Sequence, residues 1–252
     1  MLKTADASVQ AAARALRAAR SLVVTTGAGM SSDSGVPTFR DALTGLWARY
    51  DPEELATEAA FRRNPARVFG WYVWRRRLVR AAVPHAGYHA LVALERIVPE
   101  LVVVTQNVDG LHRRAGSSRV IELHGSLERA RCSRENTVFE SWDETGEAPP
   151  RCRACGAPLR PDVVWFGELL PPEALRAAER AARNCDLFLS IGTSNLVEPA
   201  ASLPWRAAAG GAEVVVINVT MEGQRSGPGI HHLIGPAGEV LPALLQAAWP
   251  AR

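Results

Sequence analysis

A short glycine-bearing segment near the N-terminus constrains the fold of this 252-residue chain more than any other feature. Residues 21–25 (Ser-Leu-Val-Val-Thr) are largely apolar and β-branched, which predicts a buried strand. The strand runs almost directly into Gly27-Ala28-Gly29. Dinucleotide-binding folds use such a junction to bring backbone N–H groups close to a pyrophosphate, because a Cβ atom there would block the phosphate. The third glycine of the common dehydrogenase fingerprint would stand at Ser32, so this segment is not that loop.

The longer sequence around these glycines carries a family resemblance. Residues 27–40 read Gly-Ala-Gly-Met-Ser-Ser-Asp-Ser-Gly-Val-Pro-Thr-Phe-Arg, which closely resembles the signature of the sirtuins, the NAD-consuming protein-lysine deacylases. Later segments match the same family in the same order along the chain: residues 105–112, 123–125, 164–168 and 192–194. The resemblance covers roughly residues 10–247 and implies a single sirtuin-type domain over residues 1–252.

The fold that this resemblance implies is α/β, a Rossmann-like doubly wound parallel sheet with an inserted small lobe. We expect the NAD-binding core at about 21–50, 100–127 and 162–247. The lobe would consist of a helical part at about 51–99 and a Cys-rich, zinc-ribbon-like module at about 128–161. The hydrophobic pattern predicts strands at 101–105, 120–123, 187–191 and 214–218, and helices at 65–83, 86–98, 172–183 and 241–249. Ala90, Leu91, Leu94 and Ile97 would form the apolar face of the second of these helices.

The resemblance implies a set of residues that bind NAD. They are Gly27, Ala28, Gly29, Ser31, Pro37, Thr38, Phe39, Arg40 and Trp47 near the glycine-bearing loop, Gln106, Asn107, Val108 and Asp109 after the strand at 101–105, and Gly192, Thr193, Ser194, Asn218, Val219, Thr220 and Ala237 on the adenosine side. A guanidinium beside a pyrophosphate loop has an obvious partner, which favours a phosphate contact for Arg40. Phe39 and Trp47 could equally pack in the core. Thr220 stands where the family commonly has an acidic residue, which leaves the ribose contact there open.

The resemblance also assigns the catalytic residues. Asn107 and Asp109 follow a buried strand, at the carboxyl edge where open α/β sheets place their ligands, and in the family they read the nicotinamide carboxamide and the ribose. The alternative for these two residues is an ordinary strand-end turn. His124 takes the position of the family's general base, a task that imidazole suits because its pKa lies near neutrality.

The helix predicted after Asn64 carries a candidate receptor for an acyl group. Tyr72 and Arg75 are three residues apart and therefore share a helix face, where a phenol beside a guanidinium suits a carboxylate. With Ala56 they resemble the class III subgroup of sirtuins, which prefers succinyl and malonyl lysine over acetyl lysine. Alternatively, Tyr72 packs in the core and Arg75 pairs with a surface glutamate. The family binds its peptide by main-chain hydrogen bonds along a segment that corresponds here to Val164, Phe166, Gly167 and Glu168.

The Cys-rich module departs from the family pattern. Sirtuins usually have two Cys-x-x-Cys pairs that bind a structural zinc ion. Here Cys152 and Cys155 form one pair, whereas Cys132 has Glu135 at the partner position. Three thiolates and one carboxylate could still hold zinc, or the module could be held by packing alone, and the sequence leaves both open. Cys185 opens a predicted strand and is expected to be buried.

The net charge and the lengths of the apolar runs limit the kinds of partner that the chain can bind. A net charge of +3 is too small to indicate nucleic-acid binding, and no apolar run approaches the ~18 residues of a membrane helix. We expect a cytoplasmic monomer, and the resemblance implies that it acts on acylated-lysine proteins or peptides. The expected activity is NAD-dependent removal of acidic acyl groups (succinyl, malonyl) with release of nicotinamide and acyl-ADP-ribose. A plain deacetylase, and a non-catalytic regulator that binds NAD or ADP-ribose, are the alternatives, and ADP-ribosyl transfer or NAD hydrolysis stays open.

Overall fold

The computed structural model describes residues 7–37, 51–222 and 224–250. Their largest unit is a six-stranded, all-parallel sheet of order β3-β2-β1-β7-β8-β9. The strands are β1 (Ser21–Thr26), β2 (Glu100–Thr105), β3 (Val120–Glu122), β7 (Leu187–Ile191), β8 (Glu213–Asn218) and β9 (Ile230–Ile234). The chain leaves β1 toward β2 on one side and later returns to β7 on the other. This change of direction creates a switch point at the carboxyl end of β1, where α/β sheets bind ligands.

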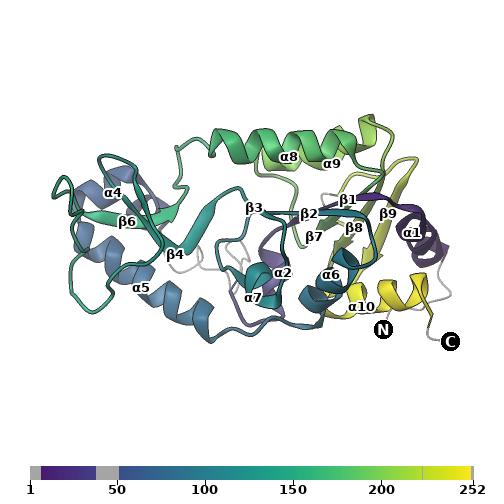
Figure 1. Ribbon diagram of the computed structural model, residues 1–252, viewed down its shortest axis with the longest axis horizontal. Helices are drawn as coiled ribbons and strands as arrows, with labels where there is room; N and C mark the ends of the chain where they lie inside the picture. The colour runs from purple at the N-terminus through teal and green to yellow at the C-terminus, as the bar shows by residue number, and fades with distance from the viewer. Residues whose placement is uncertain (1–6, 38–50, 223, 251–252) are drawn as a thin grey trace.

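Helices cover both faces of this sheet, so the predicted doubly wound fold is confirmed (Figure 1). One face carries α1 (Ala7–Ala18), α6 (Ala86–Glu95) and α10 (Ala237–Ala248). The other carries α8 (Pro172–Asn184), the 3-10 helix η2 (Ala200–Ser202) and α9 (Leu203–Ala209). The strands between these layers read as continuous apolar runs because both of their faces are buried. The short helices α2 (Ala28–Ser32) and α7 (Leu111–Ala115) follow β1 and β2 at the carboxyl edge.

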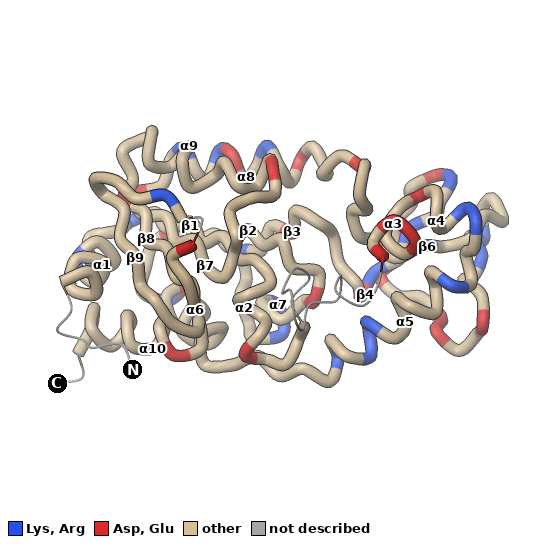
Figure 2. The backbone as a smooth tube through the Cα atoms, turned by 180° about the vertical axis from the view of Figure 1, so that it is seen from behind, with Lys and Arg blue, Asp and Glu red and all other residues tan. Residues whose placement is uncertain are grey.

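A small lobe lies at the end of the molecule away from both termini (Figures 1 and 2). It contains α3 (Pro52–Leu55), α4 (Glu58–Arg63), α5 (Pro65–Ala81) and an antiparallel sheet of order β5-β4-β6. Its strands are β4 (Gly125–Cys132), β5 (Val138–Phe139) and β6 (Leu159–Val163). Phe69, Tyr72, Leu127 and Trp165 belong to a core that is separate from the two cores beside the large sheet. The lobe therefore has the inserted character expected from the sequence.

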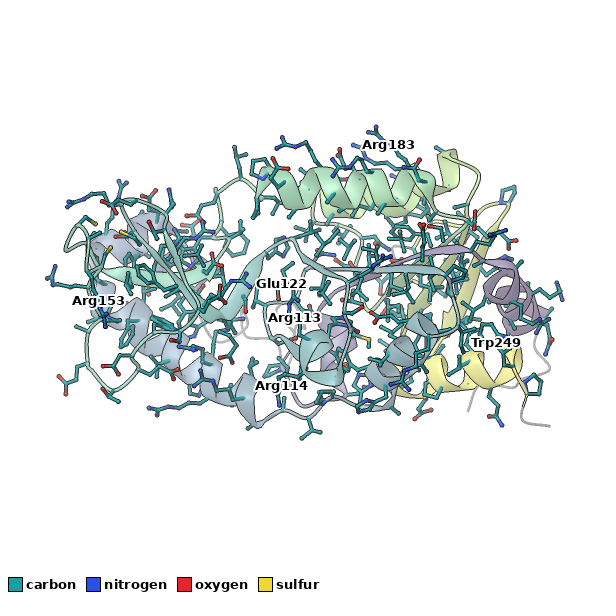
Figure 3. All side chains as sticks on the ribbon, viewed as in Figure 1. Arg113, Arg114, Glu122, Arg153, Arg183 and Trp249 are labelled. Atoms are coloured by element: carbon teal, nitrogen blue, oxygen red, sulfur yellow. The ribbon has the colours of Figure 1, made fainter. Side chains whose placement is uncertain are left out.

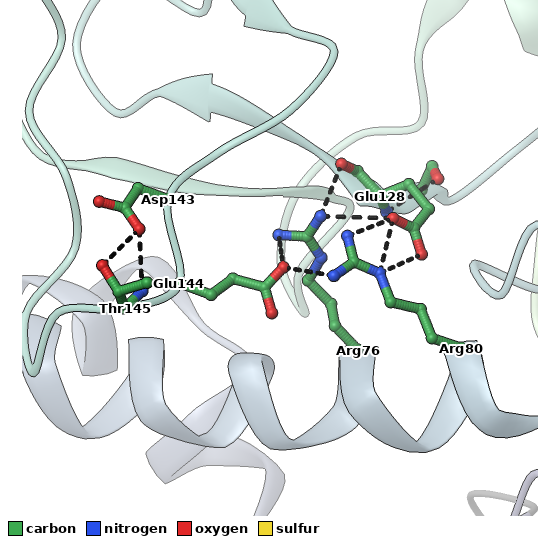
Figure 4. A network of polar contacts seen from close by, with 7 residues as sticks. Arg76, Arg80, Glu128, Asp143, Glu144 and Thr145 are labelled. Atoms are coloured by element: carbon green, nitrogen blue, oxygen red, sulfur yellow. Dashed lines mark hydrogen bonds and ion pairs between the residues drawn. The ribbon is translucent and has the colours of Figure 1, made fainter.

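Ion pairs fasten α5 to the rest of this lobe (Figure 4). The Arg76 side chain is 1% exposed, and its guanidinium lies 2.7 Å from the Glu144 carboxylate and 3.3 Å from that of Glu128. Arg80, one helical turn further along, pairs with the same two carboxylates at 2.8 Å. Because β4 carries Glu128 and a loop carries Glu144, α5 is held against both elements. These ion pairs fix the helix that also carries Tyr72 and Arg75.

Several predicted boundaries need correction. Helix α5 ends at Ala81 rather than residue 83, and α10 begins at Ala237, where Asp33 accepts a hydrogen bond from the Gly238 N–H at 3.0 Å. Helix α6 ends at Glu95, so the placement of Ile97 on its apolar face was wrong. Ile97 is 45% exposed because the chain turns there toward β2. Among the described helices, none is both long and apolar enough to cross a membrane.

Candidate active site

Three glycines bring the ends of β1 and β7 into direct backbone contact. The Gly29 N–H donates to the Gly192 carbonyl at 2.8 Å, and the Gly27 N–H donates to Ile191 at 3.0 Å. A Cβ atom on Gly29 would lie 2.8 Å from the Gly192 Cα atom, and one on Gly27 would lie 2.8 Å from the Gly192 oxygen. Close approach of phosphate was the reason that the sequence offered for these glycines. In the structure, the neighbouring backbone already requires them.

Polar side chains after β1 and β2 form one buried network. Asn107 donates both of its Nδ2 hydrogens, to the Gly27 carbonyl at 2.8 Å and to the Ser31 Oγ atom at 2.9 Å. Ser31 in turn donates to Asp109 at 2.6 Å. The other carboxylate oxygen of Asp109 accepts from the Leu111 N–H at 2.9 Å. Burial raises the pKa of Asp109, and its hydrogen bonds with Ser31 and Leu111 oppose that rise. The predicted residues Ser31, Asn107 and Asp109 therefore lie together.

His124 lies at the junction of the large sheet and the lobe, between β3 and β4. Its Nδ1 atom is 2.9 Å from the Gln106 carbonyl, which can only accept, so Nδ1 carries the proton in the neutral ring. The Nε2 atom keeps its lone pair. Burial lowers the pKa of His124, although the bond to Gln106 opposes the shift. A neutral imidazole with a fixed tautomer is the state that a general base requires.

Sequence reasoning missed two aromatic side chains that support this network. The Tyr88 hydroxyl lies 3.1 Å from Ser31 Oγ. It is the donor in this hydrogen bond, because the Ser31 hydroxyl already donates its proton to Asp109. His112 Nε2 lies 2.9 Å from Thr26 Oγ1, and the His112 ring contacts that of Tyr88 with 4.8 Å between centroids. His112 is the last residue of the motif at 105–112, and its place in that motif was the signal that could have identified it. Tyr88 falls on the buried face of α6, where the sequence suggested only packing.

Residues that the sequence predicts on the adenosine side lie around Thr193. Its carbonyl accepts from Asn218 Nδ2 at 3.1 Å, and its hydroxyl accepts from Gln106 Nε2 at 3.2 Å. Gln224, which the sequence did not single out, also donates to the Thr193 carbonyl, at 3.4 Å. Ala237 is buried at the start of α10, whereas Ser194, Val219 and Thr220 are exposed at the strand ends. Thr38, Phe39, Arg40 and Trp47 lie outside the described residues.

Arg75 shares a small pocket with the network after β2. The pocket is lined by Ala28, Ser31, Val36, Pro37, Arg75, Val79, Asn107, Val108, Asp109 and Leu127. Arg75 is only 7% exposed, and its guanidinium carbon lies 4.8 Å above the Trp71 ring and 5.4 Å from the Tyr72 ring. Burial lowers the pKa of Arg75 and raises that of Tyr72, although each group opposes the shift of the other. Both residues are therefore buried, Arg75 at this pocket, and a surface pairing of Arg75 does not fit this placement.

The segment at 164–168 borders the same region. Val164 donates its N–H to the His124 carbonyl at 2.9 Å, and Phe166 donates to the Ala56 carbonyl at 3.0 Å. Phe166 is 51% exposed and Gly167 has a φ of 84°. The Glu168 carboxylate is occupied by Arg160 and by the Trp165 N–H. The segment thus contacts both His124, predicted as the general base, and Ala56, predicted at the acyl pocket.

Two arginines, Arg129 and Arg114, connect the lobe to the large domain. Figure 3 labels Arg114 together with Arg113 and Glu122 from the same region. Arg129 on β4 pairs with Glu122 on β3 and with Asp162 on β6, at 2.8 Å each. Arg114 on α7 donates to the Val79 carbonyl at 2.8 Å and to that of Ala82 at 2.5 Å, which caps the end of α5. The helix that carries Tyr72 and Arg75 is therefore fixed relative to Asn107 and Asp109.

The Cys-rich module gathers four candidate metal ligands. The ligand atoms of Cys132, Glu135, Cys152 and Cys155 all lie within 4.8 Å of one another. The Cys132 and Cys155 sulfurs are 3.4 Å apart, and the N–H groups of Arg134 and Glu135 lie 3.5 and 3.4 Å from Cys132 Sγ. Ligands of a tetrahedral zinc ion with Zn–S bonds of about 2.3 Å are roughly 3.8 Å apart, so this set fits zinc. Cys185 is not part of this group. It is buried in the core between the large sheet and helices α8 and α9, as expected.

Comparison with known proteins finds relatives over nearly the whole chain. The model of the Sir2 family matches residues 27–199. The protein named NAD-dependent protein deacylase 1 of Pseudomonas aeruginosa is 52% identical over 250 residues, covering 96% of this chain and 100% of that protein. A solved Sir2 homologue–NAD complex gives a TM-score of 0.83 with 42% identity, covering 94% of this chain and 92% of its own. Sir2Af2 bound to a myristoylated histone peptide gives a TM-score of 0.74 with 34% identity, covering 96% of each chain.

Proposed function

The chain belongs to the Sir2 family and is an NAD-dependent protein deacylase, and we propose that it favours acyl groups that end in a carboxylate, such as succinyl and malonyl. The observation that carries this preference is the burial of the Arg75 guanidinium beside Tyr72 in a pocket shared with Asn107 and Asp109. A buried cation loses hydration, and an anionic ligand replaces it with charge-assisted hydrogen bonds.

The residues around the pocket divide the work of the reaction. NAD, when bound, supplies the ribose that releases nicotinamide and receives the acyl group. Both Nδ2 hydrogens of Asn107 are already used, which directs its carbonyl oxygen toward an amide N–H such as that of the nicotinamide carboxamide. Asp109, anchored by Ser31, orients the ribose. His124 accepts a proton at Nε2, because Gln106 holds its tautomer.

The Tyr72 phenol completes the acyl receptor. Its oxygen accepts a hydrogen bond from Trp165 Nε1 at 2.8 Å and also interacts with the Arg75 guanidinium. Burial raises the pKa of Tyr72, so the phenol keeps its proton at neutral pH. With donors already directed at its oxygen, the phenol can donate to an acyl carboxylate. Ala56 belongs to the same buried cluster as Tyr72, and its small side chain is proposed to leave room for the acyl group.

The substrate is proposed to be an acylated lysine in an extended peptide. Sir2Af2 has been solved bound to a myristoylated histone peptide. Here the segment Val164–Glu168 would pair with the peptide backbone next to Ala56 and His124. We also propose that Cys132, Cys152, Cys155 and Glu135 hold a structural zinc ion that stabilises the lobe and takes no part in the chemistry.

The test compares NAD-dependent removal of succinyl and acetyl from the same lysine peptide, followed by the mass of the peptide. We expect the wild type to prefer succinyl, and Arg75→Met to lower kcat/KM for the succinyl peptide by about 10- to 100-fold, because a hydrogen bond to a charged group contributes about 1.5–3 kcal/mol. Removal of acetyl should change little. Arg77→Met, an exposed arginine on the same helix, is the matched control. Equal removal of both acyl groups, unaffected by Arg75→Met, would indicate a plain deacetylase.

A further inference from the structure

Three consecutive residues of the 164–168 segment reach three parts of the acyl and catalytic site. Val164 is bound to the carbonyl of His124, and Phe166 is bound to that of Ala56. Between them, Trp165 points its indole into the lobe and donates from Nε1 to the Tyr72 oxygen at 2.8 Å. The segment that borders the peptide path is therefore joined directly to the phenol of the proposed acyl receptor.

The Trp165 indole is firmly held. It is 2% exposed, and the Arg160 guanidinium carbon stacks 3.6 Å from its ring centroid, while Phe61 contacts the ring at 5.4 Å between centroids. Arg160 is fixed by the Glu168 carboxylate and by the Val163 carbonyl, the latter at 2.8 Å. Glu168 Oε2, one of the oxygens that bind Arg160, also accepts a hydrogen bond from the Trp165 backbone N–H at 2.8 Å. One ion pair thus fixes both the backbone and the ring of Trp165.

The direction of the Trp165–Tyr72 bond determines what the phenol can do. An indole N–H can only donate, so the Tyr72 oxygen must be the acceptor. The phenol proton is then free of that contact and turns away from Trp165. Without the indole N–H, the phenol could rotate and offer a lone pair to the ligand, which would repel a carboxylate.

We propose that Trp165, anchored by Arg160 and Glu168, is a positioning residue that fixes the Tyr72 phenol as a hydrogen-bond donor to acidic acyl groups. This inference rests on the proposed preference for such groups. It adds that selectivity depends on a residue of the peptide-binding segment, outside the pair that meets the carboxylate.

The experiment uses Trp165→Phe, which keeps an aromatic ring and removes only the N–H donor and part of the ring. The full chain is assayed with NAD and with succinyl and acetyl forms of one peptide. We expect KM for the succinyl peptide to rise, and the ratio of its kcat/KM to that of the acetyl peptide to fall by about 5- to 10-fold. Trp142→Phe is the matched control, because Trp142 lies in the same core and, among the described residues, its N–H has no hydrogen-bond partner.

Two further measurements keep the inference separate from a general loss of structure. In a Tyr72→Phe background, Trp165→Phe should leave the succinyl-to-acetyl ratio unchanged, because the phenol that it positions is gone. Glu168→Gln, which weakens the Arg160 anchor, should lower the ratio even if Trp165→Phe folds poorly. An equal loss for both peptides, or an unchanged ratio while Arg75→Met abolishes it, would overturn this inference alone. A wild type without succinyl preference would overturn the proposed function itself.

Discussion

The Nδ1 atom of His124 lies 2.9 Å from the carbonyl oxygen of Gln106. Gln106 follows β2 and directly precedes Asn107, so one strand end both positions the amide of the site and sets the tautomer of its imidazole. Because the carbonyl accepts, the basic lone pair is on Nε2. The orientation of the His124 imidazole therefore depends on backbone geometry and needs no acidic partner for Nδ1.

This arrangement predicts the acidic limb of the pH profile. Burial lowers the pKa of His124, so the ring stays neutral at pH values where an ordinary histidine, with a pKa of about 6.5, is already charged. We expect kcat/KM to fall on the acid side only below that value. The acetyl peptide should be used, since its acyl group does not titrate. An acidic limb above pH 6.5 would contradict the assignment of His124 as a buried neutral base.

Buried His112 predicts a pH dependence of stability. Burial lowers its pKa to about 3, whereas the unfolded chain titrates near 6.5. Between these values the unfolded state binds a proton that the folded state does not, so the contribution to stability is complete above about pH 6.5 and is lost as the pH falls toward 3. His112→Gln should reduce the slope of the unfolding free energy by up to ~1.4 kcal/mol per pH unit in this window.

Urea unfolding at several pH values between 7 and about 4 would measure this slope. His89→Gln is the control, because His89 lies exposed on α6. We expect that variant to keep the slope of the wild type. A slope that is identical in His112→Gln and wild type would show that His112 takes up its proton in the folded state.

The carboxylate of Glu135 leads to a prediction of how tightly the proposed zinc ion is held. A carboxylate is a harder ligand than a thiolate and suits zinc less well in structural sites. Glu135→Cys would restore four sulfur ligands among atoms that already lie within 4.8 Å of one another. We expect that variant to retain zinc longer against a chelator and to melt at a higher temperature, and Glu135→Ala to lose zinc faster. Metal content by mass spectrometry before and after EDTA measures this; equal zinc loss in all three proteins would exclude Glu135 as a ligand.

The sequence predicted the sheet and the strand-end residues well because buried parallel strands read as unbroken apolar runs. Asn107, Asp109 and Gly192 follow such runs directly and were located correctly at one edge. Contacts between distant segments could not be predicted from the sequence. Trp165 and Tyr72 are 93 residues apart, and no local sequence pattern indicates that they form a hydrogen bond. Ile97 was misplaced because helical periodicity continues past the point where the helix ends, and Val98 is the residue that is buried there. Periodicity describes one element at a time and carries no information about its partner.

The contact between Gly29 and Gly192 yields the strictest prediction for the fold. Gly192 has a φ of 59°, and a Cβ atom there would lie 2.3 Å from the Met30 nitrogen. Backbone on both sides cannot yield cheaply, so Gly192→Ala should destabilise the protein by more than about 3 kcal/mol and abolish NAD binding. Gly35→Ala is the control: its φ is 79°, but no atom of the described residues lies within 4 Å of the added methyl. That variant should lose only about 1 kcal/mol, the usual conformational cost. Thermal melting and NAD titration of both variants measure the difference, and similar melting temperatures would show that the β1 and β7 ends can separate.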